Sequence, residues 1–299
     1  MASSRGVPRI EPTRLAELPI SAYATTLALD ESAAYLLAPH GAYRLVPGEP
    51  VQGIELALGI GPTATRSSFI FWSDGGLWKA PKTGGTSLRL AKLPLRPQYF
   101  VASGEEFAWV SQSDDGAYTI QTLAGTEPKT LVSASFELSA LDMVRDAVYF
   151  VERPTPGSWR IGVVRTAGGT PEYTSERGGR RPALLTGEDA VYYYDVDRFK
   201  VRRVSLDLRR EDDLASELVC SPVHVARGIF CGSVEGLFEL TRPSHAPRVL
   251  SHNRPGSITN VQSDARRVVW TVDLGPNRLA VDMLPATGPD GAPLSPGSP

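Results

Sequence analysis

A pair of neighbouring residues, a small aliphatic one followed by an aromatic one, recurs seven times along this chain. The aromatic member returns every 36 to 43 residues, which is the repeat length of a four-stranded propeller blade. The pairs are Ala34-Tyr35, Ile70-Phe71, Ala108-Trp109, Val148-Tyr149, Val191-Tyr192, Ile229-Phe230 and Val269-Trp270. The sequence therefore predicts an all-β, seven-bladed β-propeller of four-stranded blades, with a six-bladed ring as the alternative if the first or last unit is imperfect.

The repeated aromatic residues are predicted to pack between blades. A blade cannot bury both of its faces alone, so stacking around a ring buries each face against the next blade. One large aromatic side chain per blade fills the gap between neighbours.

A turn that contains glycine, followed by a second aromatic residue, comes after the pair in most units. Glycine suits such a turn because it adopts a positive φ without steric penalty. The fifth and seventh units depart from this pattern, with Arg198-Phe199 and Pro276-Asn277 at the same point. The five units that follow it contain Gly41-Ala42-Tyr43, Gly76-Leu77-Trp78, Gly116-Ala117-Tyr118, Gly157-Ser158-Trp159 and Gly236-Leu237-Phe238.

The two ends of the repeat region complement each other. Residues 15–19 nearly duplicate residues 90–94, which have the pattern of an outermost strand, and the seventh unit ends near Met283 without such a strand. We therefore expect the N-terminal strand to complete the last blade and remove an open sheet edge. The expected organisation is an N-terminal tail (1–12), a propeller (13–284) and a flexible Pro/Gly/Ser-rich C-terminal tail (285–299).

Several segments resemble the TolB/NHL/YWTD-like propeller superfamily. They are residues 69–80, 83–86, 147–152, 167–170 and 190–195. The resemblance extends over about Thr13 to Leu284, and its motifs are structural. It implies the propeller fold and a bias towards binding, although that group includes lyases and lactonases as well as receptor modules and peptidoglycan-associated proteins.

Composition sets limits on partners and compartment. The formal net charge is −2, so nothing in the global charge favours nucleic acid or an anionic membrane. No apolar run reaches the length of a membrane span, and no signal peptide is visible at the start. We expect a monomer without a cofactor, cytoplasmic if Met1 is the native start and extracytoplasmic if the chain has been trimmed.

The two cysteines, Cys220 and Cys231, are predicted to lie on neighbouring strands of one blade. A disulfide between them is conceivable, but the pattern favours two small buried hydrophobic residues, because cystines directly across an antiparallel pair are awkward to form.

Residues suited to catalysis or metal binding are few. A histidine acting as general acid or base would have to lie at the channel mouth, and His40 and His252 should share one face of the ring. The polar residues of the expected inner strands have no metal-ligand spacing. They are Asp142, His224, Asn260 and Gln262. We therefore predict neither catalytic residues nor a metal site.

Acidic residues stand three positions after the repeat aromatic in four of the units. A carboxylate at this point can accept hydrogen bonds from backbone N–H groups of its own turn. The alternative is a ring of acids that binds Ca²⁺ or a cationic ligand. The four residues are Asp74, Glu152, Asp195 and Asp273.

Arginines concentrate around the fifth unit. Connections between blades and loops between the second and third strands lie on the same face of a propeller, so these arginines should gather there. Guanidinium groups pair well with carboxylates and phosphates, although a solvated charged face balanced by Glu176 and Glu188 is the alternative. The candidate binding residues are Arg153, Arg177, Arg180, Arg181 and Arg198.

Together these features favour a non-catalytic binding or scaffold module. It would present a loop face to a protein or to a small anionic ligand, and no nucleic-acid partner is expected. The alternative is a lyase or lactone hydrolase at the channel mouth. That activity would need at least two convergent polar side chains, such as His40 or His252 with a loop acid.

Overall fold

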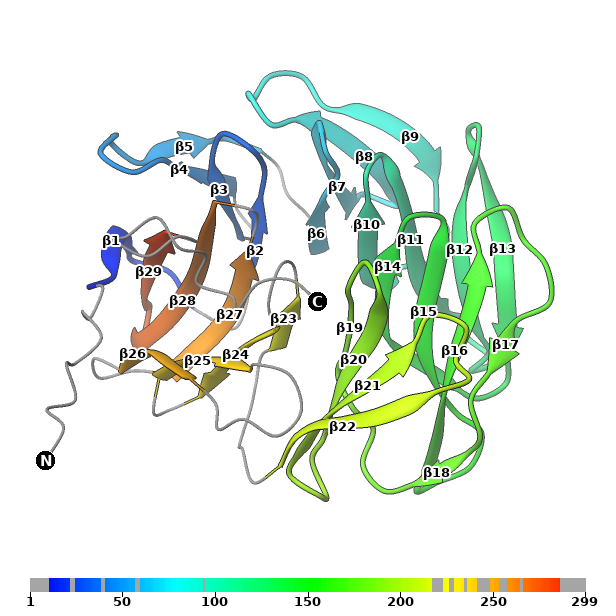
Figure 1. Cartoon of the computed structure of the whole chain (residues 1–299). Coiled ribbons are helices and arrows are strands. Elements are labelled where there is room, and N and C mark those ends of the chain that lie inside the picture. The colour runs from blue at the N-terminus through cyan, green and yellow to red at the C-terminus, as the bar shows by residue number, and fades with distance from the viewer. Residues whose placement is uncertain are drawn as a thin grey trace, which may run out of the picture.

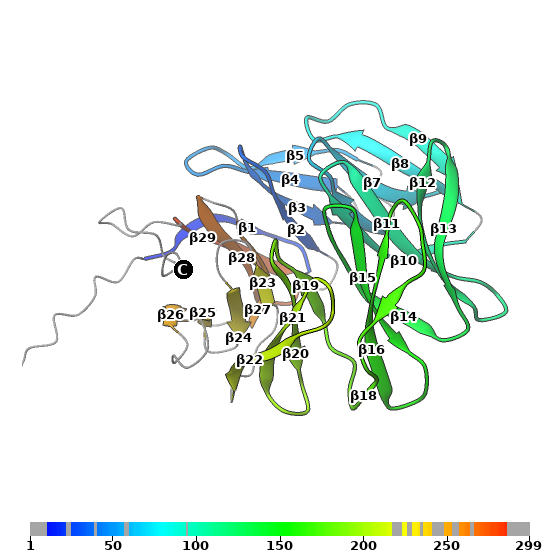
Figure 2. The same cartoon turned by 45° about the vertical axis from the view of Figure 1, so that its right-hand side comes forward.

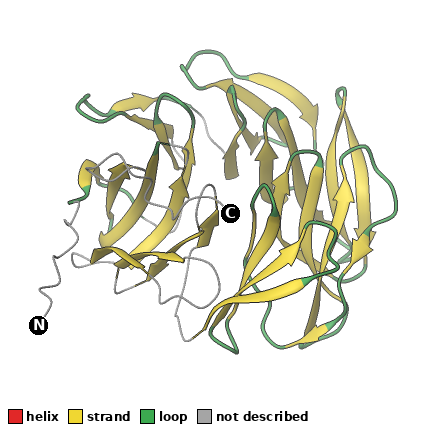
Figure 3. Cartoon of the chain, viewed as in Figure 1, coloured by secondary structure: helices red, strands yellow, loops and turns green. Residues whose placement is uncertain are grey.

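The computed structural model describes residues 11–21, 25–38, 41–56, 60–93, 95–216, 223–225, 229–233, 236–240, 248–252, 257–263 and 266–285. These residues form strands and turns without a helix (Figure 3). The strands pair into seven antiparallel sheets, and the sheets stand around a common axis (Figures 1 and 2). The all-β propeller of four-stranded blades predicted from the sequence is confirmed.

Each sheet is one blade, and in the first six blades the strands run in chain order from the axis outwards. The first three blades are β2 (Thr26–Leu29), β3 (Ala34–Ala38), β4 (Gly41–Leu45) and β5 (Gln52–Ile54); β6 (Ile60–Ala64), β7 (Ser68–Ser73), β8 (Gly76–Pro81) and β9 (Leu88–Lys92); and β10 (Pro97–Ser103), β11 (Glu106–Gln112), β12 (Tyr118–Ala124) and β13 (Glu127–Ala134).

The next three blades follow the same plan, and the fourth has a divided outer edge. They are β14 (Glu137–Val144), β15 (Ala147–Arg153), β16 (Ser158–Arg165) and the two short strands β17 (Glu172–Tyr173) and β18 (Arg177–Gly178); β19 (Leu184–Thr186), β20 (Ala190–Asp195), β21 (Lys200–Ser205) and β22 (Glu211–Ser216); and β23 (Val223–Val225), β24 (Ile229–Ser233), β25 (Gly236–Leu240) and β26 (Arg248–His252).

The last blade combines both ends of the propeller. It contains β27 (Ser257–Ser263), β28 (Arg267–Gly275), β29 (Arg278–Pro285) and, as its outermost strand, β1 (Thr13–Leu18). Strand β1 is antiparallel to β29, with Thr13 opposite Met283 and Leu18 opposite Leu279. The predicted closure of the last blade by the N-terminal strand is therefore confirmed.

The inner strands close the ring. Each of them contacts the inner strand of the next blade, and β27 of the last blade contacts β2 of the first. Each pair of adjacent blades encloses its own hydrophobic cluster. The core of the protein is thus divided into layers between blades.

All seven repeat aromatics are buried, as the repeat pattern predicts. The side towards which they point varies: Tyr149 packs against the following blade, whereas Trp109 packs against the preceding one. Successive side chains of a strand point to opposite faces, so a shift of one residue moves the aromatic from one interface to the other. The cluster between the last and first blades has only aliphatic residues among its buried members, such as Leu36 and Leu279.

The two faces of the ring differ in their connections. One face, here called the turn face, carries the turns between first and second strands and between third and fourth strands. Hydrogen bonds join neighbouring blades there: Arg66 N donates to Gly104 O (2.7 Å), Arg145 N to Ser103 Oγ (3.0 Å) and Arg267 Nη2 to Asp30 O (2.7 Å). The other face, here called the loop face, carries the loops between second and third strands and the connections between blades.

Two further predictions can be compared with the structure. Cys231 is buried and disulfide-bonded, so the preference for two unpaired cysteines was wrong; Cys220, the other cysteine of the sequence, lies outside the described residues. Among the described residues, no helix is long and apolar enough to cross a membrane.

Candidate partner-binding face

The connection between the fourth and fifth blades is held in place on both sides. Gly179 N donates to Gly157 O of the fourth blade (2.9 Å), and Arg180 N donates to Asp197 Oδ2 of the fifth (2.6 Å). Gly179 has a φ of 113°, and a Cβ there would collide with the Asp197 carboxylate, so glycine is required. The loop that carries most of the candidate arginines is therefore ordered by the blades beneath it.

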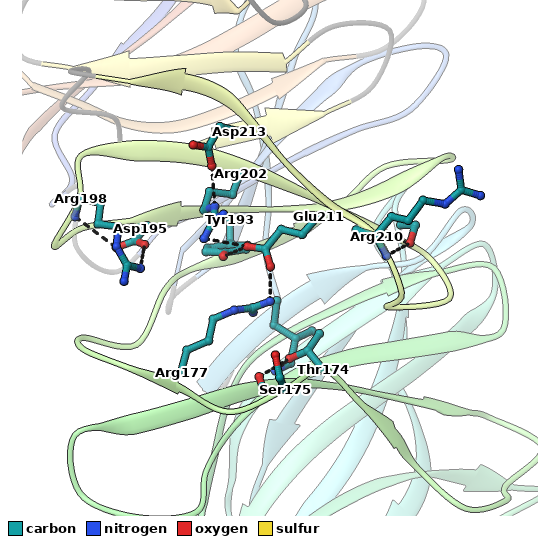
Figure 4. Close-up of polar contacts among 12 residues, drawn as sticks. Thr174, Ser175, Arg177, Tyr193, Asp195, Arg198, Arg202, Arg210, Glu211 and Asp213 are labelled. Carbon is teal, nitrogen blue, oxygen red and sulfur yellow. Dashed lines mark hydrogen bonds and ion pairs between the residues drawn. The ribbon is translucent and has the colours of Figure 1, made fainter.

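Arg177 points into the interface between these blades instead of outwards (Figure 4). Its side chain is only 14% exposed. The guanidinium pairs with the Glu211 carboxylate, and its central carbon lies 5.2 Å from the Trp159 ring centroid and 5.7 Å from that of Tyr193. Arg177 thus joins the fourth blade to the fifth through the ion pair with Glu211 and the cation–π contact with Tyr193, while its contact with Trp159 lies within the fourth blade.

Glu211 is the centre of this network. Its carboxylate also accepts a hydrogen bond from the Tyr193 hydroxyl and pairs with Arg202 Nη1 at 3.0 Å. Arg202 Nε in turn donates to Asp213 Oδ1 at 2.8 Å (Figure 4). Burial, with the hydrogen bond to Glu211, raises the pKa of Tyr193, which therefore remains a donor at neutral pH.

Two of the other candidate arginines share one carboxylate. Arg153 Nη1 lies 2.9 Å from Glu137 Oε2, and Arg181 pairs with the other oxygen of the same group. Glu137 begins the inner strand β14, so this group ties the fourth blade to the connection that leads into the fifth.

Arg198 belongs to the loop between β20 and β21. Asp195, which is only 6% exposed, accepts a bond from the Arg198 backbone N–H (3.2 Å) and pairs with its guanidinium (2.8 Å). The Arg198 side chain is 57% exposed. Arg180 likewise has a side chain that is 77% exposed, against 43% for Asp197, which lies 3.7 Å from it.

The structure therefore separates the five predicted arginines into two groups. Arg177 is part of the interface between blades. The others lie on the loop face, and in each of their ion pairs the arginine is more exposed than the carboxylate. Their side chains are 35–77% exposed, and those of the paired carboxylates are 6–43% exposed.

The predicted loop acids have mixed roles. Asp195 and Asp273 accept bonds from backbone N–H groups of their own turns, as the sequence pattern predicts. Glu152 pairs with Arg160 instead, and Asp74 occupies a turn position with φ of 49°. The predicted turn-stabilising role is thus confirmed for two of the four.

Three exposed aromatic residues on the loop face were not selected by sequence reasoning. They are Tyr99, Phe136 and Phe199. The remaining exposed large apolar residues of the described chain are aliphatic, Val51 and Leu88. Phe199 did leave a signal in the sequence, because it interrupts the glycine pattern of the third-strand turns.

Asp142 is the polar residue of the inner strands whose surroundings the structure defines most fully. It is half-buried on β14, where its two carboxylate oxygens accept bonds from Met143 N (2.8 Å) and from Thr186 N of the next inner strand (2.5 Å). Burial outweighs these bonds and raises the pKa of Asp142 to about 6. Asp142 therefore couples the fourth and fifth blades near the axis.

This coupling gives a pH dependence. A carboxyl whose pKa is raised in the folded state binds its proton more tightly there, so stability falls as pH rises from about 4 to 6. We expect the stability of the wild type relative to Asp142→Asn to fall by about 1–3 kcal/mol over that window. Urea unfolding of both proteins at pH 4.5 and 7.5 measures it, and a difference that is the same at both pH values would contradict the prediction.

The residues considered for a lyase remain untested. His40 and His245 lie outside the described residues, and for His224 and His252 only the backbone is described. Among the described residues, no group of three or more histidine, cysteine, aspartate or glutamate side chains could hold a metal ion.

Comparison with known proteins identifies the fold. No family model matches the chain, and no curated protein matches its sequence. Similar solved structures include an oligogalacturonate lyase in complex with manganese (TM-score 0.68, 10% identity, covering 92% of this chain and 93% of that one). They also include the Pan2 WD40 domain of Neurospora crassa (TM-score 0.64, 11% identity, 97% and 100%) and BamB of Moraxella catarrhalis (TM-score 0.52, 14% identity, 87% and 84%).

These similarities concern the fold alone. They confirm the propeller fold that the sequence resemblance implies. At such identities the matched structures support a propeller and carry no function to this chain.

Proposed function

We propose that this chain is a seven-bladed, non-catalytic binding module whose loop face, over the fourth and fifth blades, receives a protein or a small anionic ligand. The observation that supports the proposal is that four exposed or half-buried arginine side chains on this face are each more exposed than the carboxylate with which they pair. Guanidinium groups offer paired N–H donors to a carboxylate or phosphate. Because the loop between the blades is already ordered by Gly157 and Asp197, little ordering entropy is lost on binding.

Charge reversal tests this proposal. The variant Arg180→Glu/Arg181→Glu should lose the specific partner that the wild type captures from a lysate of the native host, compared by mass spectrometry. The matched control is Arg66→Glu/Arg145→Glu, which reverses two exposed arginines on the turn face and should retain the partner. Capture that is the same for both variants and the wild type would show that the arginine face is the wrong surface.

The disulfide of Cys231 supports the extracytoplasmic alternative for the compartment, because disulfides persist in oxidising environments. The protein is purified from its host in the presence of iodoacetamide and is then denatured in the same reagent. We expect it to have incorporated no iodoacetamide before reduction and two equivalents after reduction. A Cys231→Ser variant should take up one equivalent without reduction. Two equivalents on the unreduced wild type would contradict the proposed compartment.

A further inference from the structure

The turn between β20 and β21 ends in a phenylalanine with a left-handed backbone. Phe199 has a φ of 51°, a region that residues with a Cβ seldom adopt and bulky residues least of all. The residue is 51% exposed, so burial of its ring does not offset this strain.

Three other blades have a better suited residue at the equivalent point, directly before the third strand. These are Gly75 with φ of 66°, Gly157 with φ of 82° and Asn277 with φ of 55°. Glycine and asparagine adopt this backbone at low cost. The fold alone would therefore favour one of them in place of Phe199, and strain retained at an exposed position points to a use of the side chain outside the fold.

The surroundings of Phe199 indicate what it could contact. Arg198 precedes it, with its guanidinium exposed and its backbone fixed by Asp195. The connection that carries Arg180 is fixed to the same loop through Asp197. An exposed aromatic ring and two exposed guanidinium groups thus stand together on ordered loops.

A second exposed aromatic residue extends this surface over the fourth blade. Phe136 directly precedes Glu137, the carboxylate shared by Arg153 and Arg181. Two exposed aromatic residues and several arginines therefore lie on the loop face of two neighbouring blades.

We propose that this surface binds a protein segment in which carboxylates stand next to aromatic or aliphatic side chains. Phe199 would be the apolar anchor, and Arg180 and Arg198 would pair with the carboxylates. Aromatic residues and arginine contribute most at protein interfaces. This inference rests on the proposed function and adds the class of partner.

A nucleic acid suits the surface less well. Affinity for nucleic acid depends on neutralising a row of phosphates with unpaired positive charge. Here three carboxylates, those of Glu137, Asp195 and Asp197, lie among the arginines and already pair with them. They would repel a phosphodiester backbone, whereas single carboxylates of a peptide can approach one guanidinium at a time.

A selection from a random 12-residue peptide library displayed on phage tests the partner class. We expect the enriched peptides to have Asp or Glu within a few positions of Phe, Tyr, Trp or Leu. Affinities of the synthesised peptides, measured by fluorescence anisotropy, should fall at least tenfold with Phe199→Asn. Because asparagine relieves the left-handed strain, the same variant should melt at an equal or higher temperature, which a purely structural phenylalanine would not allow.

Two matched controls lie away from this surface. Leu88→Asn changes the most exposed of the large apolar residues, at the start of the outer strand β9, and Arg66→Gln changes an exposed arginine of the turn face. Both should leave the peptide affinity unchanged.

The outcomes separate this inference from the proposed function. Wild-type affinity in Phe199→Asn would overturn the inference, while the proposed function would stand if Arg180→Glu/Arg181→Glu still abolished binding. If the double reversal also left the affinity unchanged, both would fail. Failure to enrich any peptide, enriched peptides without acidic residues, or tighter binding of a 12-nucleotide oligouridine would overturn the proposed class of partner.

Discussion

Replacing Trp109 by alanine is expected to lower the free energy of unfolding by about 3–5 kcal/mol. The side chain is fully buried between the second and third blades, where it packs against Ile70 and Leu77. Its ring stacks on that of Phe107 at a centroid distance of 6.1 Å, and its indole N–H donates to Gln121 Oε1 at 3.1 Å. The truncation would leave a cavity lined by both blades, which a rigid pair of sheets closes only in part.

Urea unfolding of the purified variant measures this loss. Tyr99→Ala is a suitable control, because it removes an exposed aromatic side chain from the same blade, and it should cost less than about 1 kcal/mol. A Trp109→Ala protein as stable as this control would mean that the interface between these blades does not depend on its central aromatic residue.

Replacing Glu211 by alanine is expected to cost about 3 kcal/mol or more, although no hydrophobic residue is removed. The substitution leaves the Arg177 guanidinium, 14% exposed, without its carboxylate between Trp159 and Tyr193. It also removes the acceptor of the Tyr193 hydroxyl. A charge that remains buried without its partner typically costs about 3–5 kcal/mol; because Glu211 is itself 20% exposed, we expect the lower end.

A second substitution separates charge from hydrogen bonding. Glu211→Gln keeps an acceptor for Tyr193 but removes the negative charge, so it should destabilise less than Glu211→Ala. The double variant Glu211→Ala/Arg177→Met should recover part of the loss, because it removes the unpaired cation together with the anion. Thermal or urea unfolding measures all three. A double variant less stable than Glu211→Ala would show that Arg177 stabilises the interface mainly through its contacts with the rings.

The sequence predicts the repeating parts of this molecule well. The spacing of the aromatic pairs depends on the length of a blade, and the similarity of residues 15–19 to residues 90–94 depends on the shared pattern of outer strands. Both are properties of the repeat, and they can be recognised without knowing which residues lie close to one another in space. The interface that receives each aromatic residue cannot be predicted in this way, because Tyr149 and Trp109 differ by one position within their strands and so face opposite sides.

The ion pairs that join the fourth and fifth blades are the part of the site that sequence reasoning missed. Glu137 and Arg181 are 44 residues apart, and Arg177 and Glu211 are 34 apart, so no local pattern joins them. Local spacing groups Arg177 with Arg180 and Arg181, although burial separates the first from the other two. Phe199 is the opposite case, because its departure from the glycine pattern was visible in the sequence and its significance becomes clear only with its backbone conformation.

The pairing of β1 with β29 also determines how the ring would respond to mechanical force. Thr13 and Met283 lie opposite each other at the end of this ladder from which both chain ends leave, and Leu18 and Leu279 lie at its inner end. A pull applied through the two termini would therefore load the hydrogen bonds one after another, as in opening a zipper, instead of all at once. The propeller should open at this single seam under low tension, while the other blades stay intact.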